Sequence, residues 1–349
     1  MSFWQNYEED FIIMYSYIKN VKKILEKKSK KYDSVFVEYD KETTIQFIFE
    51  SNTIEKEGLN EGETKKLYYE VISGKINENN LLKNISCICS KENISFEYNK
   101  KTKDLQTTYN QIIGLIIANS TIRELFIDSI KTEQLYLSRQ KKGFRNKTNL
   151  NKITKPKSYI TEDFIKNIHQ HLTQELDNNN NGNPGEYRTD GACIGLDTIF
   201  TPPALINNSM RILIKNHEKR VNNPYYNHML EGIILAAQLV RIHPFGDSNG
   251  RLSRIILNTF FKIEHLPFCL VLRAQKKDRE KYIYCMKKYY SLQNISPFVW
   301  LVSNIFQIQI ERLNSLLTDV GLPKITPAKL NAQEIEFIKN SLKYYITTR

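Results

Sequence analysis

The sequence is poor in the residues that interrupt regular structure most often. It has only 13 glycines and 10 prolines among 349 residues, about half of the average combined usage of roughly 12%. This shortage disfavours a turn-rich β-sandwich or propeller and favours a helical protein. The five cysteines are odd in number. Cys87 and Cys89 form a C-x-C pair, but no second pair follows at zinc-binding spacing. We therefore expect reduced thiols, without a disulfide framework or a zinc site.

Long apolar runs and an N-terminal targeting segment are also missing. The longest apolar runs, at 112–118 and 233–237, are far shorter than the roughly 20 residues of a membrane span. The first residues show no basic segment followed by an apolar one, which a secretory signal needs. We expect a cytoplasmic protein with no membrane partner, or an effector delivered into a host cytosol by a secretion system, since the two look alike in sequence.

The chain does have ordinary globular proportions and a surplus of positive charge. Hydrophobic residues make up 41% and charged residues 25%, and the net charge is +12. A length of 349 residues suggests roughly two domains, and the basic, turn-rich stretch 139–158 is the expected boundary between them. The surplus charge indicates an affinity for phosphates or acidic surfaces without saying which.

Apolar residues recur at helical spacing along most of the chain. This spacing predicts helices at about 7–31, 42–56, 104–118, 121–137, 162–176, 204–220 and 225–242. Residues 34–39 are expected to form a short strand or an extended linker, and 73–103 a loop. The alternation over 186–200 predicts a β-hairpin.

One twelve-residue run, HPFGDSNGRLSR at 243–254, gathers the groups that phosphate chemistry needs. A loop of small residues leads into an apolar helix, whose first turn presents free N–H groups to an anion. Arg251 and Arg254 share one face of that helix, and guanidinium groups suit phosphate oxygens. Asp247 can hold a divalent cation, and His243 is suited to accept a proton from a hydroxyl. Together these groups predict phosphoryl or nucleotidyl transfer.

This run closely resembles the Fic (Fic/Doc) family motif H-x-F-x-[DE]-[GA]-N-[GK]-R-x-x-R, with Ser248 as its one departure. The resemblance implies an all-α fold with a small β-hairpin flap. It also implies a protein adenylyltransferase (AMPylator), which moves AMP from ATP to the Ser, Thr or Tyr hydroxyl of a protein with the help of Mg²⁺. Gly250 favours nucleotidyl transfer, because the kinase-like branch of the family has lysine there.

The resemblance also implies roles for single residues. His243 would be the general base, Asp247 would bind Mg²⁺, and Asn249 with Gly250 would build the anion hole. The residues implied in nucleotide or phosphate binding are Ser248, Asn249, Gly250, Arg251 and Arg254 in the motif, Ile194, Gly195 and Leu196 in the flap, and Tyr282 beyond the motif. Tyr290 stands where the family pattern has asparagine.

A segment far upstream resembles the inhibitory helix [ST]-x-x-x-E-[GN] that some Fic proteins carry before the core. Residues 51–55 (SNTIE) make Ser51 and Glu55 the inhibitory pair, with Glu55 set against Arg254. A second register ends at Glu57 and matches the pattern fully. We prefer Glu55, because the family usually has isoleucine directly before its glutamate.

The resemblance divides the chain into three parts. An N-terminal helical region, 1–150, carries the inhibitory helix at about 42–58, and the Fic core spans 155–305. The tail, 306–349, resembles the start of a winged helix-turn-helix, and we expect it to be a packing helix without DNA-binding power. The expected partner is a target protein, which includes the chain itself, and a homodimer is compatible with the sequence. The alternatives are a de-AMPylating hydrolase that uses the same site and a non-enzymatic regulator that binds nucleotide or DNA.

Overall fold

The structure, a computed structural model, describes residues 4–27, 29–89, 98–141, 160–176, 183–194 and 198–347. Its helices are α1 (Tyr7–Glu26), α2 (Lys30–Ile54), α3 (Glu61–Ile72), α4 (Ile85–Ile88), α6 (Tyr98–Lys141), α8 (Glu162–Thr173), α9 (Pro203–Val221), α10 (His228–Ile242), α11 (Asn249–Ile263), α12 (Lys276–Leu292), α13 (Ser296–Asp319) and α14 (Ala332–Thr347), with single 3-10 turns at Glu78–Asn80 and Leu82–Asn84. In these ranges the strands are β1 (Cys193–Ile194) and β2 (Thr198–Ile199), which pair antiparallel. The predicted all-α class with a small hairpin is confirmed. None of the described helices is long and apolar enough to span a bilayer.

Two predictions of local structure were wrong. Residues 34–39 are neither a strand nor a linker but the second turn of α2, in which Phe36 and Tyr39 are 3% and 1% exposed. Burial of their rings against the core outweighs the weak preference of valine and aromatic residues for strands. The helices expected at 104–118 and 121–137 are one helix, α6, which begins inside the expected loop at Tyr98.

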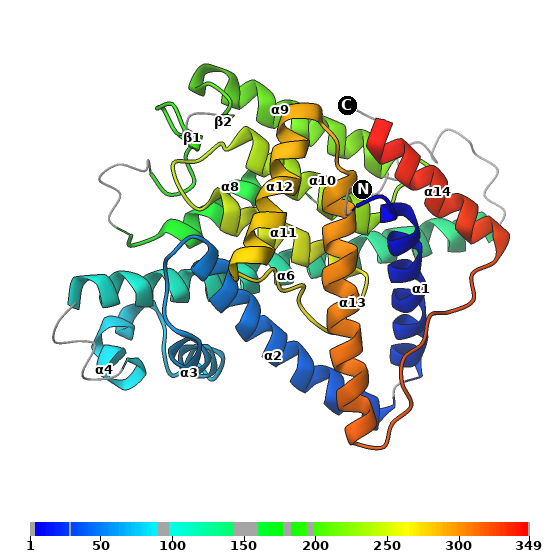
Figure 1. Ribbon diagram of the computed structural model, residues 1–349, viewed down its shortest axis with the longest axis horizontal. Coiled ribbons are helices and arrows are strands. Elements are labelled where there is room, and N and C mark those ends of the chain that lie inside the picture. Colours follow the sequence, from blue (N-terminus) through cyan, green and yellow to red (C-terminus); the bar gives the residue numbers. More distant parts are fainter. Residues whose placement is uncertain are drawn as a thin grey trace.

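The antiparallel pair α10 and α11 forms the centre of the molecule (Figure 1). Both helices bury residues on nearly all sides, and α10 begins at an Asn227 side chain that accepts a hydrogen bond from the N–H of Leu230. A helix that is apolar all round needs neighbours on every side. Those neighbours are α2, α6, α8, α9, α12, α13 and α14. The turn between α10 and α11 is therefore held on a rigid base.

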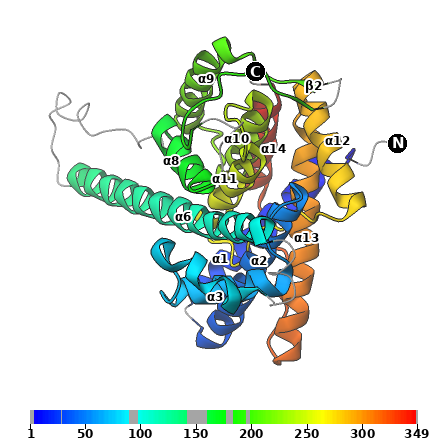
Figure 2. The same ribbon diagram turned by 90° about the vertical axis from the view of Figure 1, so that its left-hand side faces the viewer.

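The N-terminal helices are integrated with the rest of the protein. Helix α6 runs between α8–α11 on one side and α1–α3 on the other (Figure 2). One buried cluster joins α1 and α2 to α10–α14, and a second joins α2, α3 and α6 to α8–α11. Both apolar cores thus cross the predicted boundary at 139–158, and the end of α2 is brought to the α10–α11 turn.

A buried ionic cluster attaches the tail helix α14 to the core. Glu231 of α10 is fully buried and accepts hydrogen bonds from Arg220 Nε (2.8 Å) and Nη2 (2.9 Å). His217 Nδ1 lies 2.7 Å from the same carboxylate, and the Tyr345 hydroxyl of α14 donates to it at 2.8 Å. The charge of Arg220 and the hydrogen bond from His217 hold the pKa of Glu231 at about 2, well below its usual value. Helix α14 is thus attached to α9 and α10 by a buried polar cluster.

We predict that Glu231→Ala lowers the free energy of unfolding by about 3–5 kcal/mol, because it leaves the buried Arg220 without its counter-charge. Because the folded-state pKa is depressed, the ionised carboxylate stabilises the fold above pH ~4.5, and this contribution is lost as the pH falls towards 2. Urea unfolding at pH 7 and at pH 3 measures both effects. Glu218→Ala, at an exposed position of α9, is the matched control, and equal losses in the two variants would contradict the prediction.

Candidate active site

Two residues in the left-handed backbone conformation frame the turn that joins α10 to α11. His243 follows the last residue of α10 with φ 52° and ψ 58°, and Ser248 precedes the first residue of α11 with φ 60° and ψ 7°. This conformation costs a residue other than glycine roughly 1–2 kcal/mol. The contacts around the turn must therefore hold it in place.

The Asn249 side chain provides some of these contacts. Its Oδ1 accepts a hydrogen bond from the Phe245 N–H (3.0 Å), and its Nδ2 donates to Phe245 O (2.8 Å) and Asp247 O (3.3 Å). The side chain is 2% exposed. Its carboxamide therefore supports the turn from inside, and the part of Asn249 left for an anion is its backbone N–H.

His169 of α8 supports the same turn, although the sequence had suggested no role for it. Its ring stacks on Phe245 with centroids 3.7 Å apart. Nδ1 accepts the Gly185 N–H at 3.0 Å, so Nε2 carries the proton and donates to Asp247 O at 3.2 Å. Burial lowers the pKa of His169 to about 4 and keeps the ring neutral at pH 7.

The first turn of α11 is the expected anion site. The first N–H groups of the helix have no intrahelical partner and present a positive end, and the Ser248 side chain does not cap them. A Cβ atom at Gly250 would lie 2.3 Å from Glu55 Oε1 and 3.0 Å from Arg254 Nη1. Only glycine leaves room for a negatively charged oxygen here, and a carboxylate already lies where an external anion would bind.

Arg254 is held by the last turn of α2, 199 residues away in sequence. Its Nε donates to Ser51 Oγ (2.9 Å), and its Nη2 donates to Ser51 O (2.8 Å) and Glu55 Oε1 (2.7 Å). The guanidinium side chain is 4% exposed, whereas the Glu55 side chain is 36% exposed. The structure thus brings together Ser51, Glu55 and Arg254.

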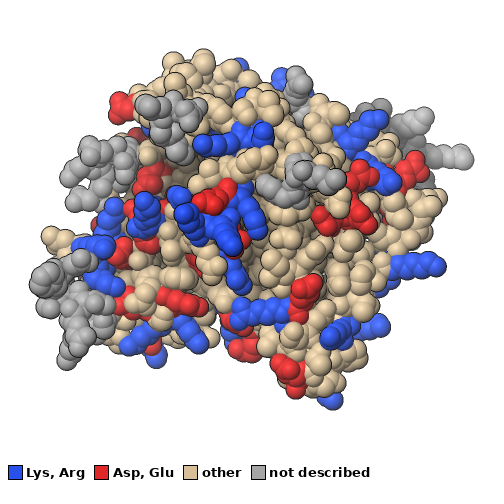
Figure 3. Space-filling view, in the orientation of Figure 1, with Lys and Arg blue, Asp and Glu red and all other residues tan. Residues whose placement is uncertain are grey.

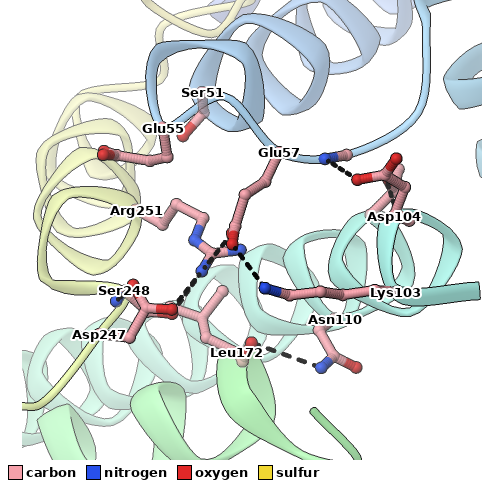
Figure 4. A network of polar contacts seen from close by, with 12 residues as sticks. Ser51, Glu55, Glu57, Lys103, Asp104, Asn110, Leu172, Asp247, Ser248 and Arg251 are labelled. Carbon is pink, nitrogen blue, oxygen red and sulfur yellow. Dashed lines mark hydrogen bonds and ion pairs between the residues drawn. The ribbon is translucent and has the colours of Figure 1, made fainter. Parts of the chain in front are cut away.

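Arg251 meets the other glutamate of the same segment (Figure 4). Its fully buried Nη2 lies 3.1 Å from Glu57 Oε2 and 3.5 Å from Asp247 Oδ2, and it donates to Ser248 Oγ at 2.7 Å. Lys103 of α6 approaches Glu57 from the other side at 3.2 Å. The glutamates of both candidate registers therefore contact the motif: Glu55 contacts Arg254, and Glu57 contacts Arg251.

The hydroxyl of Ser248 gives a physical account of the one departure from the motif. It accepts the hydrogen bond of Arg251, which a glycine or alanine could not do. The contact fixes Arg251 relative to the turn and offsets part of the cost of the left-handed backbone at Ser248.

Asp247 is the residue best placed to hold a metal ion. Its side chain is 38% exposed, and its Oδ1 accepts the N–H of Ser248. Among the described residues, no three His, Cys, Asp or Glu side chains converge on one point. A single accessible carboxylate fits Mg²⁺, which usually binds through one or two carboxylates together with substrate phosphates and water.

His243 lies beside this anion site in its neutral form. Burial, followed by the charge of Arg188, lowers its pKa to about 4, against the smaller opposing effects of Glu55 and Asp247. The Phe200 ring stacks on the imidazole with centroids 3.9 Å apart and planes 10° from parallel. A neutral imidazole at pH 7 can accept a proton from a hydroxyl that reaches it.

Arg188, in the stretch 185–188 that resembles the start of the family's flap hairpin, is a neighbour of the site to which the sequence assigned no role. Its Nε donates to His243 O at 2.8 Å, and its Nη1 and Nη2 donate to Asp190 O and Thr201 O. Its own N–H donates to Pro244 O at 3.0 Å. All these acceptors are backbone carbonyls, which every residue carries, so no side-chain pattern could have indicated them.

The flap lies next to these residues. Cys193 pairs with Ile199 and Ile194 with Thr198, and the Tyr290 hydroxyl of α12 donates to Ile199 O. Gly195 and Leu196, expected to border the nucleotide, lie outside the described residues.

Helix α12 borders the end of α2. Tyr282 is buried beside Arg254, with its ring 6.1 Å from that of Phe298, and burial raises the pKa of its phenol. Arg279 Nε donates to Ile54 O at 3.3 Å. Lysine and arginine side chains gather over the start of this helix (Figure 3), where Lys276 and Lys277 are exposed. This positive surface would favour the approach of a polyphosphate.

Comparison with known proteins agrees with this geometry. Residues 159–261 match the model of the Fic/DOC family. Among curated relatives, the protein adenylyltransferase Fic of Drosophila willistoni is 31% identical over 123 residues, which cover 34% of this chain and 23% of the relative. That of Drosophila mojavensis is 30% identical over 151 residues, 42% of this chain and 28% of the relative. The chain thus spans about a quarter of the length of these relatives.

Solved structures show that the fold extends beyond the matched segment. A Fic domain containing signaling protein from Bacteroides thetaiotaomicron has a TM-score of 0.56 at 17% identity and covers 87% of this chain and 98% of its own. Fic-1 from C. elegans has a TM-score of 0.53 at 17% identity and covers 88% of this chain and 74% of its own. The motif and the family match agree that residues 159–261 form a Fic domain, and the fold around this segment is that of solved Fic-domain structures.

Proposed function

We propose that this protein is a protein adenylyltransferase that moves AMP from ATP to the Ser, Thr or Tyr hydroxyl of a protein. The observation that carries the proposal is a neutral His243 beside a helix start that has two buried arginines in its first turns and the Glu55 carboxylate against Gly250 and Arg254. The relatives described as adenylyltransferases support it.

The reaction needs a base and a site for a polyphosphate. His243 takes the proton of the target hydroxyl while the hydroxyl oxygen forms a bond to the α-phosphorus of ATP. The bond from that phosphorus to the oxygen bridging to the β-phosphate breaks, and pyrophosphate leaves. Arg251, Arg254 and the first N–H groups of α11 stabilise the phosphate charge. Mg²⁺, when bound at Asp247, would neutralise further charge on the phosphates.

Glu55 restrains this activity in the proposed mechanism. Its carboxylate occupies both the start of α11 and the Nη2 atom of Arg254, so the phosphates of ATP and Glu55 compete for the same donors. The Glu55 carboxylate must leave Arg254 Nη2 before that nitrogen can bind phosphate, whereas the two Ser51 contacts can keep the guanidinium in place.

ATP labelled at either the α- or the γ-phosphate tests the proposed reaction. Incubation with ATP labelled at the α-phosphate should label the chain itself or a protein in a lysate, and incubation with γ-labelled ATP should not. Transfer of the γ-label in place of the α-label would mean a kinase and would contradict the proposal.

Two further experiments address the partners of the protein. Mass spectrometry of the labelled proteins identifies the targets, and analytical sedimentation tests for a homodimer.

The accessible carboxylate of Glu55 favours one second candidate. It points into the site and is 36% exposed, so it could orient a water molecule for removal of AMP from a modified protein. Release of AMP by the wild type, lost in Glu55→Gly, would identify such a hydrolase. A non-enzymatic regulator would instead bind nucleotide or DNA equally well after His243→Ala, with a steep salt dependence for DNA.

A further inference from the structure

Arg188 is a buried cation that joins the flap to the candidate base. Its residue is 6% exposed, and the structure gives it no carboxylate partner among the described residues. Its guanidinium instead donates to three carbonyls, of His243, Asp190 and Thr201. A buried charge with only neutral partners is costly, which indicates that its geometry serves a purpose beyond stability.

The first of these contacts acts on the strained backbone of the base. His243 has the left-handed conformation, with φ 52°. Arg188 Nε binds the His243 carbonyl, and the Arg188 N–H binds the next carbonyl, of Pro244. One residue thus fixes two consecutive carbonyls where α10 ends, and with them the direction of the imidazole.

The other two contacts act on the flap. Asp190 precedes β1 and Thr201 follows β2, so both ends of the hairpin are attached to one guanidinium. Phe200, the neighbour of Thr201, stacks on the His243 ring. A displacement of the flap would therefore be transmitted to the base through both Arg188 and Phe200.

We infer that Arg188 is a positioning residue, which holds His243 in its productive orientation only while the flap is in place. As a consequence for the proposed function, binding of a target segment at the flap would be coupled to alignment of the base. The charge of Arg188 also lowers the pKa of His243, second only to burial, whereas Glu55 and Asp247 act in the opposite direction.

Two substitutions separate the geometry from the charge. Arg188→Met removes both, whereas Arg188→Lys keeps the charge but cannot bind several carbonyls in a fixed fork. We expect Arg188→Met to raise the pKa of His243 and Arg188→Lys to raise it less. NMR titration of the imidazole measures this pKa in the absence of any substrate. In a Glu55→Gly background, both variants should lower kcat about 100-fold with little change in the KM for ATP, since a small misplacement of a reacting group costs about that much.

Arg211→Met, at an exposed position of α9 where the side chain binds only Asn208 Oδ1, is the matched control. A folded Arg188→Met protein with unchanged kcat and an unchanged His243 titration would overturn the inference. Because the titration needs no substrate, it remains informative even if the chain transfers no AMP.

A different observation concerns Glu57, which is anchored separately from Glu55. Glu55 directly follows α2, whereas the turn after it is fixed to α6: Gly58 N–H donates to Asp104 Oδ1 (2.9 Å) and Leu59 N–H to Thr108 Oγ1 (3.0 Å). Figure 4 shows Glu57 between Lys103 and Arg251. Glu55, at the end of α2, thus contacts Arg254, whereas Glu57, in a turn attached to α6, contacts Arg251.

The geometry points to Glu57 as a second restraint on the same site, in addition to the proposed role of Glu55. Its Oε2 forms an ion pair with Nη2 of the fully buried Arg251 at 3.1 Å, and its charge lies next to that of Asp247, 3.5 Å from the same nitrogen. A phosphate that approaches Arg251 meets the negative charges of Glu57 and Asp247 beside the guanidinium.

We expect Glu57→Gln to raise the affinity for a non-hydrolysable ATP analogue with Mg²⁺ about tenfold, which corresponds to roughly 1.4 kcal/mol. The double variant Glu55→Gly/Glu57→Gln should exceed Glu55→Gly by a similar factor in calorimetry. Glu61→Gln, exposed in the first turn of α3, is the control, and melting temperatures verify folding. Equal affinities of the double variant and Glu55→Gly would reject the second restraint, and this readout does not depend on any transfer of AMP.

Discussion

Replacement of His243 by alanine is expected to lower the transfer of AMP at least 1,000-fold, within the roughly 10²–10⁴ range of general-base catalysis. In the proposed mechanism the imidazole is the general base, and it is neutral at pH 7 because its pKa is lowered to about 4. Without it, the target hydroxyl must lose its proton to water. The rate of α-label incorporation from ATP measures the loss, in the Glu55→Gly background where activity is highest.

The matched control is His171→Ala on α8, whose side chain the structure does not place at the site. The nucleotide analogue should still bind to His243→Ala, because the arginines and the start of α11 are unchanged. Wild-type rates in His243→Ala would remove this residue from the mechanism.

The same base predicts an unusual pH dependence. A histidine with the ordinary pKa of about 6.5 would lose half of its activity at that pH. Because the pKa of His243 is lowered to about 4, and because the base acts in its unprotonated form, the rate should stay flat from pH 8 down to about pH 5 and fall only below it.

The second large effect is expected from Glu55→Gly, which should raise AMP transfer by about 10- to 100-fold, the range that coupling free energies between two ligands commonly span. The substitution removes the carboxylate from Arg254 and from the start of α11 at once. Ser51 still binds Arg254 through its hydroxyl and carbonyl, so the arginine remains in place and its Nη2 becomes available to phosphate.

Thr53→Gly is the control, because it places the same flexible residue in the same turn of α2 at an exposed position. Initial rates with α-labelled ATP and the affinity for the ATP analogue should both rise in Glu55→Gly and stay constant in Thr53→Gly. If Glu55→Gly is no more active than the wild type while His243→Ala is inactive, Glu55 does not restrain the site.

The proximity of the candidate site residues was predictable where these residues lie close together in the chain. The twelve residues 243–254 form one turn and the start of one helix, so the spacing of His243, Asp247 and the two arginines already implied their proximity. The turn itself needed the structure: Asn249 supports the turn from inside, and Ser248 has a left-handed backbone and a hydroxyl bound to Arg251.

The prediction of secondary structure from the sequence failed where tertiary packing outweighs the local preference of the residues. Val35 and Val37 favour a strand over 34–39, but Phe36 and Tyr39 are buried on one face of α2. A helix of this length carries Ser51 and Glu55 to the α10–α11 turn, which a linker would not do.

The sequence by itself determined the helical class, the motif at 243–254 and the two glutamates at 55 and 57, because each depends on residues near one another in the chain. The tertiary structure alone decided how these parts meet. It showed that Glu55 and Glu57 contact different arginines, and that Arg188 binds the carbonyls of His243, Asp190 and Thr201. Contacts to backbone carbonyls, and contacts across about 200 residues, leave no local pattern, because the folded chain alone brings the partners together.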